Sequence, residues 1–141
     1  MVNTIPVRCS LHNKNDNTNI MCVAESDDIK EICKCKVYTD DTHSTWTISS
    51  WFTKDGYNGK GIGRLTLYNI IDYLYKLYGK PLNIEYIWNG TNEYVFNWLI
   101  KHFDAVCKCP IAIQKTQSDD DWSSHIYVLN TDKVLKYFNI E

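Results

Sequence analysis

Short runs of alternating apolar and polar residues occupy the first third of the chain, a pattern typical of strands that bury one face. We expect strands at residues 4–9, 20–25, 31–38 and 44–52. Residues 12–19 are rich in Asn and Asp and should form a loop between the first two strands. Residues 24–32 carry several charged side chains and would also suit a short helix.

After a glycine-rich segment at residues 54–63, the apolar period changes to that of a helix. One face of this helix carries the apolar residues Leu67, Ile70, Ile71, Leu74, Leu77 and Tyr78, which we predict to be buried. The sequence Gly79-Lys80-Pro81 should end the helix, because glycine and proline both terminate helices. An alternating strand is predicted next, at residues 82–88.

A second helix is predicted to begin at Asn92, a favourable N-cap residue, and to run to about Phe103. Its inward face should carry Val95, Trp98 and Leu99. Strands at residues 106–114 and 125–130 and a short terminal helix complete the chain. This order of elements predicts one α/β (α+β) domain over residues 1–141, built on a mixed, mainly antiparallel sheet with helices on its faces.

Composition narrows the classes of function. The chain has 141 residues, of which 44% are apolar, and a net charge of −2. Its only arginines are Arg8 and Arg64, and its lysines do not gather on one face, so we expect no nucleic-acid partner. Apolar runs are too short for a membrane span, and the first residues lack the pattern of a leader peptide. We therefore expect no membrane association and a cytoplasmic location.

The six cysteines include two Cys-x-Cys pairs, Cys33/Cys35 and Cys107/Cys109, and both pairs lie in alternating runs. Their side chains are therefore predicted to face the core, where a thiol packs as a small hydrophobic group. Zinc or a disulfide bond is the alternative, but structural zinc sites usually space two cysteines further apart. We expect no metal site, and reduced thiols in a cytosol-like compartment.

The segment that carries the chemistry is Lys54–Gly63, which contains four glycines between a predicted strand and a predicted helix. Glycines let backbone N–H groups converge, and the start of a helix adds a partial positive charge, so the segment is suited to binding an anion. A Walker loop would need Gly at Lys54 and Ser or Thr at Gly61. A dinucleotide fingerprint would need Gly at Arg64, and too little sequence follows for a doubly wound sheet.

The sequence Tyr57-Asn58-Gly59-Lys60-Gly61-Ile62-Gly63-Arg64 resembles the pyrophosphate loop of the GNAT N-acetyltransferases, whose pattern is Gln/Arg-x-x-Gly-x-Gly/Ala. Asn58, Gly61 and Gly63 fall on its three fixed positions, with Asn58 departing from Gln or Arg. The strand, Asn92, helix and Phe103 that follow also match the family's order. The resemblance covers residues 44–130.

The resemblance implies a cofactor, acetyl-CoA or another acyl-CoA, and a pose for it. The backbone amides that would receive the pyrophosphate belong to Gly59, Lys60, Gly61, Ile62, Gly63 and Arg64. The pantetheine arm would lie against the end of the preceding strand, at Phe52 and Thr53. Asn92 would contact the same arm from the second helix.

For catalysis, Glu85 is the best-placed candidate for a general base, because its side chain leaves the apolar face that Ile84 and Tyr86 share. A surface carboxylate is the alternative interpretation. The loop that borders the acceptor site in the family here carries Asp119, Asp120, Asp121 and Trp122. These residues would suit a cationic amine or peptide as acceptor, although a solvated turn is the simpler interpretation.

Two departures from the family pattern bear on activity. The tyrosine acid expected about seven residues after Asn92 is replaced by Leu99, next to Trp98, and neither can donate a proton. Residues 11–29 are too short and polar for the two helices that wall the acceptor pocket, so we expect these helices to be shortened or missing. The acceptor side would then be open, or completed by a protein partner or a second copy.

Two hypotheses follow. The first is an enzyme that transfers an acyl group from CoA to an amine, which can be a small molecule or a peptide. The second is a GNAT-shaped interaction protein that has lost turnover and keeps the fold and CoA binding. Frequent Asn, Ile, Lys and Tyr with scarce Arg is typical of AT-rich genomes, viral ones among them, and a viral source is a hypothesis from composition alone.

Overall fold

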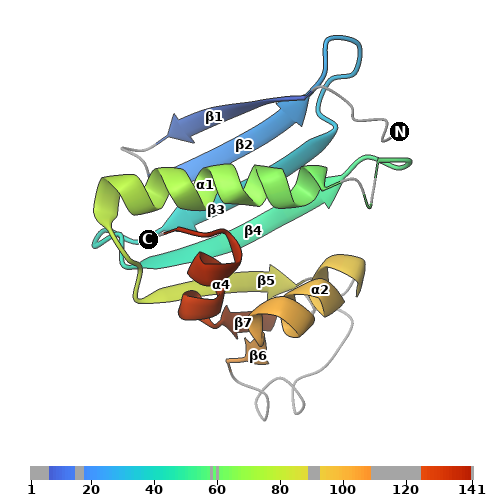
Figure 1. The fold of residues 1–141 in the computed structure, drawn as a ribbon. Helices are drawn as coiled ribbons and strands as arrows, with labels where there is room; N and C mark the ends of the chain where they lie inside the picture. The colour runs from blue at the N-terminus through green and yellow to red at the C-terminus, as the bar shows by residue number, and fades with distance from the viewer. Residues whose placement is uncertain are drawn as a thin grey trace.

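The computed structural model describes residues 7–14, 18–57, 59, 61–88, 93–108 and 125–140. They form a seven-stranded sheet in the order β1-β2-β3-β4-β5-β7-β6 (Figure 1). The strands are β1 (Arg8–Lys14), β2 (Asn19–Glu25), β3 (Cys33–Thr39), β4 (Thr45–Thr53), β5 (Asn83–Trp88), β6 (Val106–Cys107) and β7 (His125–Leu129). β4 and β5 run parallel, and the other neighbouring strands pair antiparallel. The predicted mixed, mainly antiparallel sheet is confirmed.

Three described helices, α1 (Ile62–Tyr78), α2 (Glu93–Phe103) and α4 (Thr131–Tyr137), cover one face of this sheet (Figure 1). The strand residues that point toward them include Cys22, Cys35, Ile48 and Ile84, all of which are buried. The register places these side chains on one face, because directly paired residues of adjacent strands point the same way. The hydrophobic core therefore lies between the sheet and one layer of helices.

The first two strands form a hairpin whose pairing extends from Arg8 with Glu25 to Lys14 with Asn19. The expected loop at residues 12–19 is therefore wrong for residues 12–14. The described strand begins at Arg8, and residues 4–6 of the predicted strand lie outside the described residues. Polar side chains do not prevent pairing at the edge of a sheet, where one face and one side of the strand meet water.

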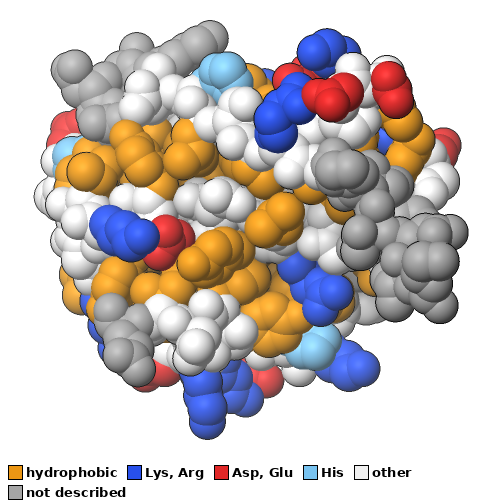
Figure 2. All heavy atoms as spheres, turned by 45° about the horizontal axis from the view of Figure 1, so that its top comes forward, with side chains coloured by type: hydrophobic (Ala, Val, Ile, Leu, Met, Phe, Trp, Pro, Cys, Tyr) orange, Lys and Arg blue, Asp and Glu red, His pale blue; other side chains and the backbone are white. Residues whose placement is uncertain are grey.

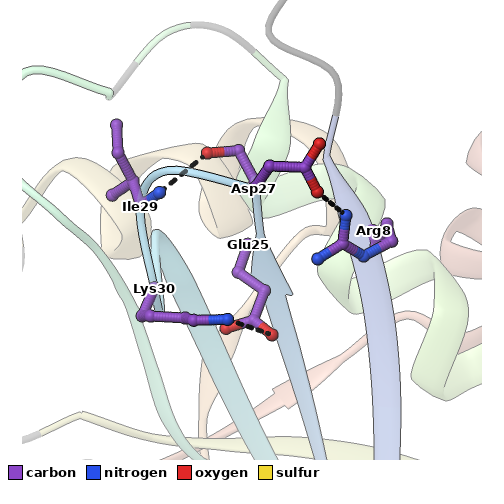
Figure 3. Close-up of polar contacts among 6 residues, drawn as sticks. Arg8, Glu25, Asp27, Ile29 and Lys30 are labelled. Atoms are coloured by element: carbon purple, nitrogen blue, oxygen red, sulfur yellow. Dashed lines mark hydrogen bonds and ion pairs between the residues drawn. The ribbon is translucent and has the colours of Figure 1, made fainter.

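The connection between β2 and β3 is a turn, not the short helix considered for residues 24–32 (Figure 3). The hydroxyl of Ser26 accepts a hydrogen bond from the backbone N–H of Ile29 at 3.0 Å, which offers the backbone an alternative to a helix. Asp27 pairs with Arg8 across the hairpin. Within the described part of residues 7–57 there is no helix, in agreement with the expected loss of the N-terminal helices.

Helix α1 buries Ile62, Thr66, Leu67, Ile70, Ile71 and Leu74. The prediction is wrong for Leu77, which is 49% exposed because it lies at the margin of the apolar stripe, in the last turn. Tyr78 is half-buried and stacks on His43, with 4.0 Å between ring centroids. Hydrophobic side chains form a band across the face of the molecule that Figure 2 shows. No helix in the described ranges is long and apolar enough to cross a membrane.

The described cysteines are free thiols. Cys33 and Cys35 point into the core as predicted, and burial raises the pKa of both thiols. Cys107 is half-buried, and Cys109 lies outside the described residues. Among the described residues, no group of three or more His, Cys, Asp or Glu side chains could hold a metal ion.

The last predicted strand before the acidic loop is described only at its start, as β6; residues 109–114 lie outside the described ranges. The predicted terminal helix is confirmed as α4. Its N-cap is Asn130, whose side chain accepts a hydrogen bond from the backbone N–H of Lys133 at 3.0 Å.

Candidate functional site

The glycine loop enters α1 in a left-handed conformation. Gly59 and Gly61 have φ values of 79° and 80°, which glycine adopts without the steric cost that other residues meet. Gly61 is the N-cap of α1, and no side chain that the structure describes caps the helix there. The first intrahelical bond runs from the N–H of Leu65 to the carbonyl of Gly61, at 3.1 Å. The amides of Ile62, Gly63 and Arg64 are therefore available to an anion, at the positive end of the helix dipole.

Arg64 brings a full positive charge to the same place. A Cβ atom placed on Gly61 would lie 3.1 Å from Nη2 of Arg64, so the guanidinium lies against the loop. Its Nη1 donates a hydrogen bond to the hydroxyl of Tyr137 on α4 at 3.2 Å, and this hydroxyl raises the pKa of Arg64. The side chain is held beside the uncapped amides by a residue from the far end of the chain.

A pocket of about 270 Å³ opens at this point. It lies between the end of β4, the start of α1 and the first turns of α2, and it is lined by Trp51, Thr53, Tyr57, Gly59, Gly61, Gly63, Arg64, Tyr94, Val95 and Trp98. The indole N–H of Trp51 donates to the carbonyl of Gly63 at 3.2 Å, which ties β4 to the first turn of α1. The pocket thus combines backbone donors and a guanidinium with aromatic walls.

Strands β4 and β5 separate next to this pocket. Their parallel pairing runs from Thr45 with Asn83 to Ile48 with Tyr86 and ends there, while β4 continues to Thr53 (Figure 1). At the same point the register of β3 with β4 shifts between Lys36 and Val37, so that Ser49 is an extra residue on β4. Beyond the shift, β4 follows β3, and β5 remains paired with β7. The result is a V-shaped opening with the glycine loop at the β4 side of its mouth.

The structure places some of the residues predicted to bind the cofactor around the pocket. Thr53, Gly59, Gly61, Gly63 and Arg64 all line the pocket. Ile62 is buried in the core, so it could offer only its backbone. Phe52 pairs with Lys34 and is 45% exposed, with its side chain on the sheet face opposite the helices. The remaining residues predicted for the site lie outside the described residues: Asn58, Lys60, Asn92, Asp119, Asp120, Asp121 and Trp122.

Sequence reasoning missed the aromatic lining of the pocket, which consists of Trp51, Tyr57, Tyr94 and Trp98. Trp98 was predicted to face inward, and it contacts Trp51 edge-to-face with 5.7 Å between ring centroids. The signal for Trp51 was its place in an alternating strand, but alternation cannot show that the strand ends at a pocket. Tyr137 gave no signal, because its role depends on where α4 packs.

Glu85 lies on the sheet face opposite the helices, as predicted from its alternation with Ile84 and Tyr86. It pairs with Thr47 on β4, one position before the strands separate. Glu85 is only 7% exposed, and its Oε2 lies 3.0 Å from Nζ of Lys108. The alternative of a freely solvated carboxylate is therefore wrong, because the group is nearly buried and ion-paired.

The position where the GNAT pattern has a tyrosine acid holds no proton donor. Leu99 is fully buried. Trp98 packs edge-to-face on Phe103 and Tyr137, with 5.1 and 5.4 Å between ring centroids. Burial raises the pKa of the nearby strand residue Tyr86 to about 12, so its hydroxyl stays protonated near neutral pH. Trp98, Phe103 and Tyr137 pack α2 and α4 against each other beside the pocket.

Comparison with protein-family models and with curated protein sequences gives no match. Solved structures do resemble this one. A GNAT-family acetyltransferase from Staphylococcus aureus has a TM-score of 0.63 at 12% identity, over 82% of this chain and 70% of that one. A Bacillus subtilis acetyltransferase in complex with CoA has a TM-score of 0.57 at 13% identity, over 88% and 97%.

A third similar structure is a spermidine N-acetyltransferase chimera of Vibrio cholerae SpeG and hSSAT, with a TM-score of 0.52 at 12% identity, over 84% and 72% of the two chains. The mixed sheet, its separated parallel pair and the helix that follows the glycine loop thus define a GNAT acetyltransferase fold. At these identities the likeness establishes the fold.

Proposed function

We propose that this protein is an acyl-CoA-dependent N-acyltransferase that moves an acetyl group from acetyl-CoA to an amine. The observation that carries the proposal is the uncapped start of α1, which opens with two left-handed glycines onto a pocket beside separated parallel strands. A simple turn into a helix needs neither the pocket nor the guanidinium of Arg64. CoA-bound and amine-acetylating proteins among the similar structures support the same class.

In this proposal the diphosphate of CoA lies on the amides from Gly59 to Arg64, with the Arg64 guanidinium as its counter-charge. Lys60 would add a second cation. The pantetheine arm follows the unpaired edge of β4 near Phe52 and Thr53, and Asn92 meets it from the other side. Bound acetyl-CoA supplies an activated acyl group, and the chain supplies its position, which is a large part of the catalysis of such transfers.

Glu85 is the proposed general base. It lies where β4 and β5 begin to separate, and it already accepts an ammonium group, that of Lys108, at 3.0 Å. A cationic acceptor amine can make the same contact and lose a proton to the carboxylate. The acidic loop with Asp119, Asp120, Asp121 and Trp122 would add attraction for a cationic small molecule or peptide. Reduced thiols suit a reducing compartment such as the cytosol.

A second candidate function is a GNAT-fold interaction protein that binds CoA without turnover. The observation that favours it is the absence of a proton donor at Leu99 and Trp98, whose side chains are committed to packing. In this case the open acceptor face would contact a protein partner or a second copy.

Release of free CoA thiol from acetyl-CoA, measured across a panel of polyamines, amino acids and lysine-containing peptides, distinguishes the two functions. The enzyme predicts amine-dependent release that is lost in Gly61→Glu. Binding of acetyl-CoA without release on any amine would leave only the interaction protein. The matched control is Gly56→Glu, because Gly56 has a similar φ of 88° with nothing near its Cβ position and does not line the pocket.

A further inference from the structure

The ion pair of Glu85 with Lys108 differs from the other ion pairs that the described residues make with one another. The side chain of Glu85 is 9% exposed, whereas the carboxylate side chains of the others are 24–86% exposed. Exposed pairs contribute little and exchange readily with water. In this pair the ammonium of Lys108, whose own side chain is 52% exposed, compensates the desolvation of the nearly buried Glu85 carboxylate.

The sheet fixes where Lys108 approaches. Its backbone N–H donates to the carbonyl of Ile126 on β7 at 2.8 Å, directly after β6. From there the side chain crosses β7 and reaches Glu85 on β5. The Lys108 amine is thus brought to the strand that forms one side of the V-shaped opening, on the face opposite the helices.

The distance along β4 connects this amine to the proposed cofactor. From Thr53 at the glycine loop back to Ile48, the last residue of β4 that pairs with β5, the strand covers five residue steps, or roughly 16 Å at the usual rise. An acyl-CoA with its diphosphate on the loop and its arm extended along β4 would carry its thioester toward that end. The register puts Glu85 opposite Thr47, directly beyond Ile48.

We propose that Lys108 is an acyl acceptor within its own chain, a site of self-acylation with Glu85 as the proton acceptor. The inference rests on the proposed binding of acyl-CoA. The ammonium of Lys108 gives a proton to Glu85, and the neutral Nζ attacks the thioester carbonyl. The N–C bond forms as the C–S bond breaks, the departing CoA thiolate takes up the second proton that Nζ loses, and an Nε-acetyl-lysine remains.

The product differs from the starting state in charge. Acetylation removes the positive charge of Lys108 and with it the ion pair, so that Glu85 loses its partner. The carboxylate is then available to an external amine. Self-acylation of Lys108 therefore converts an occupied acceptor position into an open one, and acyl transfer to other amines should follow it in time.

The test is incubation of the full chain with acetyl-CoA, followed by intact-mass analysis and peptide mapping. One acetyl group is expected on Lys108, with a first-order rate constant that is independent of protein concentration and at least about tenfold that of Lys76. Lys76 is the internal comparator, because it is paired at the same 3.0 Å with Asp72 but its side chain is 74% exposed. Uncatalysed acetylation would favour this more accessible lysine.

Three variants complete the test. Glu85→Gln should slow acetylation of Lys108 by about 10²–10⁴-fold, the usual contribution of a general base. Lys108→Arg keeps the positive charge and should abolish the modification. Gly61→Glu should abolish it as well, whereas Gly56→Glu should not. If Glu85→Gln fails to fold, as judged by its melting curve, Lys108→Arg and the comparison with Lys76 still decide.

The outcomes separate this inference from the proposed function. If acetyl-CoA raises the melting temperature but Lys108 is acetylated no faster than Lys76, self-acylation is overturned and the cofactor site stands. If the apparent first-order rate constant rises in proportion to protein concentration, the acceptor is another chain, and the inference is again overturned. If acetyl-CoA leaves the melting temperature unchanged, the proposed function and this inference fail together.

Discussion

The two ends of the V-shaped opening are built differently. At its mouth, the glycine loop, Arg64 and the aromatic walls hold one another through backbone conformation and packing. At its closed end, the proposed chemistry depends on a single ion pair, Glu85 with Lys108, on a sheet face that no described helix covers. A cofactor site made of backbone tolerates sequence change, whereas a catalytic site made of one or two side chains does not. Cofactor binding and turnover should therefore separate in variants.

The largest effect is expected from a charge placed at the mouth of the opening. Gly61→Glu puts a carboxylate where the diphosphate is proposed to lie and should abolish stabilisation by CoA, measured by thermal unfolding. The left-handed φ of 80° will also cost about 1–2 kcal/mol without ligand. Gly56→Glu carries the same charge and similar strain, and it should keep its response to CoA. Equal loss of the response in both variants would contradict the assignment of the loop.

A change at the closed end should have the opposite signature. Glu85→Gln should lower the rate of thiol release by about 10²–10⁴-fold, because a general base is lost. Its stabilisation by CoA should remain, since the mouth is untouched. Steady-state release and melting curves on the same protein sample measure both. Turnover that survives in Glu85→Gln would assign the base elsewhere.

The aromatic wall is predicted to belong to the fold as much as to the site. Trp98→Ala removes the contacts with Trp51, Phe103 and Tyr137 and should destabilise the protein by about 3 kcal/mol, the lower end for such a truncation because Trp98 is half-buried. Urea unfolding measures the change. Exposed Tyr94, on the same helix and also at the pocket, provides the contrast: Tyr94→Ala should cost less than about 1 kcal/mol.

Alkaline unfolding tests the burial of Tyr86 at the base of the opening. Its folded pKa of about 12 lies above the ordinary value of about 10, so the unfolded chain releases the proton first as pH rises. The stability that Tyr86 contributes is complete below about pH 10 and is lost as pH rises toward 12, up to about 3 kcal/mol. Tyr86→Phe should lack this part of the pH dependence. Parallel curves for the two proteins between these pH values would show that the hydroxyl is not buried.

The smallest effect is expected at Gly63, the second glycine of the loop pattern. Gly63 has no left-handed φ, and a Cβ there would meet Thr53 Oγ1 at 3.4 Å and Trp51 Nε1 at 3.5 Å, which are ordinary contacts. Gly63→Ala should therefore stabilise α1 by about 0.5–1 kcal/mol, through helix propensity. Gly61→Ala should instead destabilise by about 1–2 kcal/mol. Melting temperatures that move in the same direction would contradict the conformations of the loop.

The elements that the sequence predicted well are those that bury one face. Strands such as β3 and helix α1 carry a clear period, and the position of Glu85 followed from alternation alone. The glycine loop was predictable because its spacing has a mechanical reason, the left-handed φ of Gly61 at the start of a helix.

What the sequence could not predict depends on contacts between distant residues. The strand at residues 12–14 is held by pairing with β2, although its side chains are polar. Tyr137 reaches Arg64 from another element, and Lys108 reaches Glu85 across a strand. No local sequence pattern marks Tyr137 or Lys108 as a partner. The packing of α4 brings Tyr137 to Arg64, and the order of β5, β7 and β6 brings Lys108 to Glu85.

The most direct test of the central claim is thermal unfolding of the protein in CoA and in pantetheine, which has the same arm and no diphosphate. At a CoA concentration 100 times its Kd, binding contributes about 2.7 kcal/mol, which should raise Tm by about 5–10 °C for a chain of this size. Pantetheine should leave Tm nearly unchanged. A Tm that saturating CoA does not raise, or that pantetheine raises equally, would contradict a diphosphate site at residues 59–64.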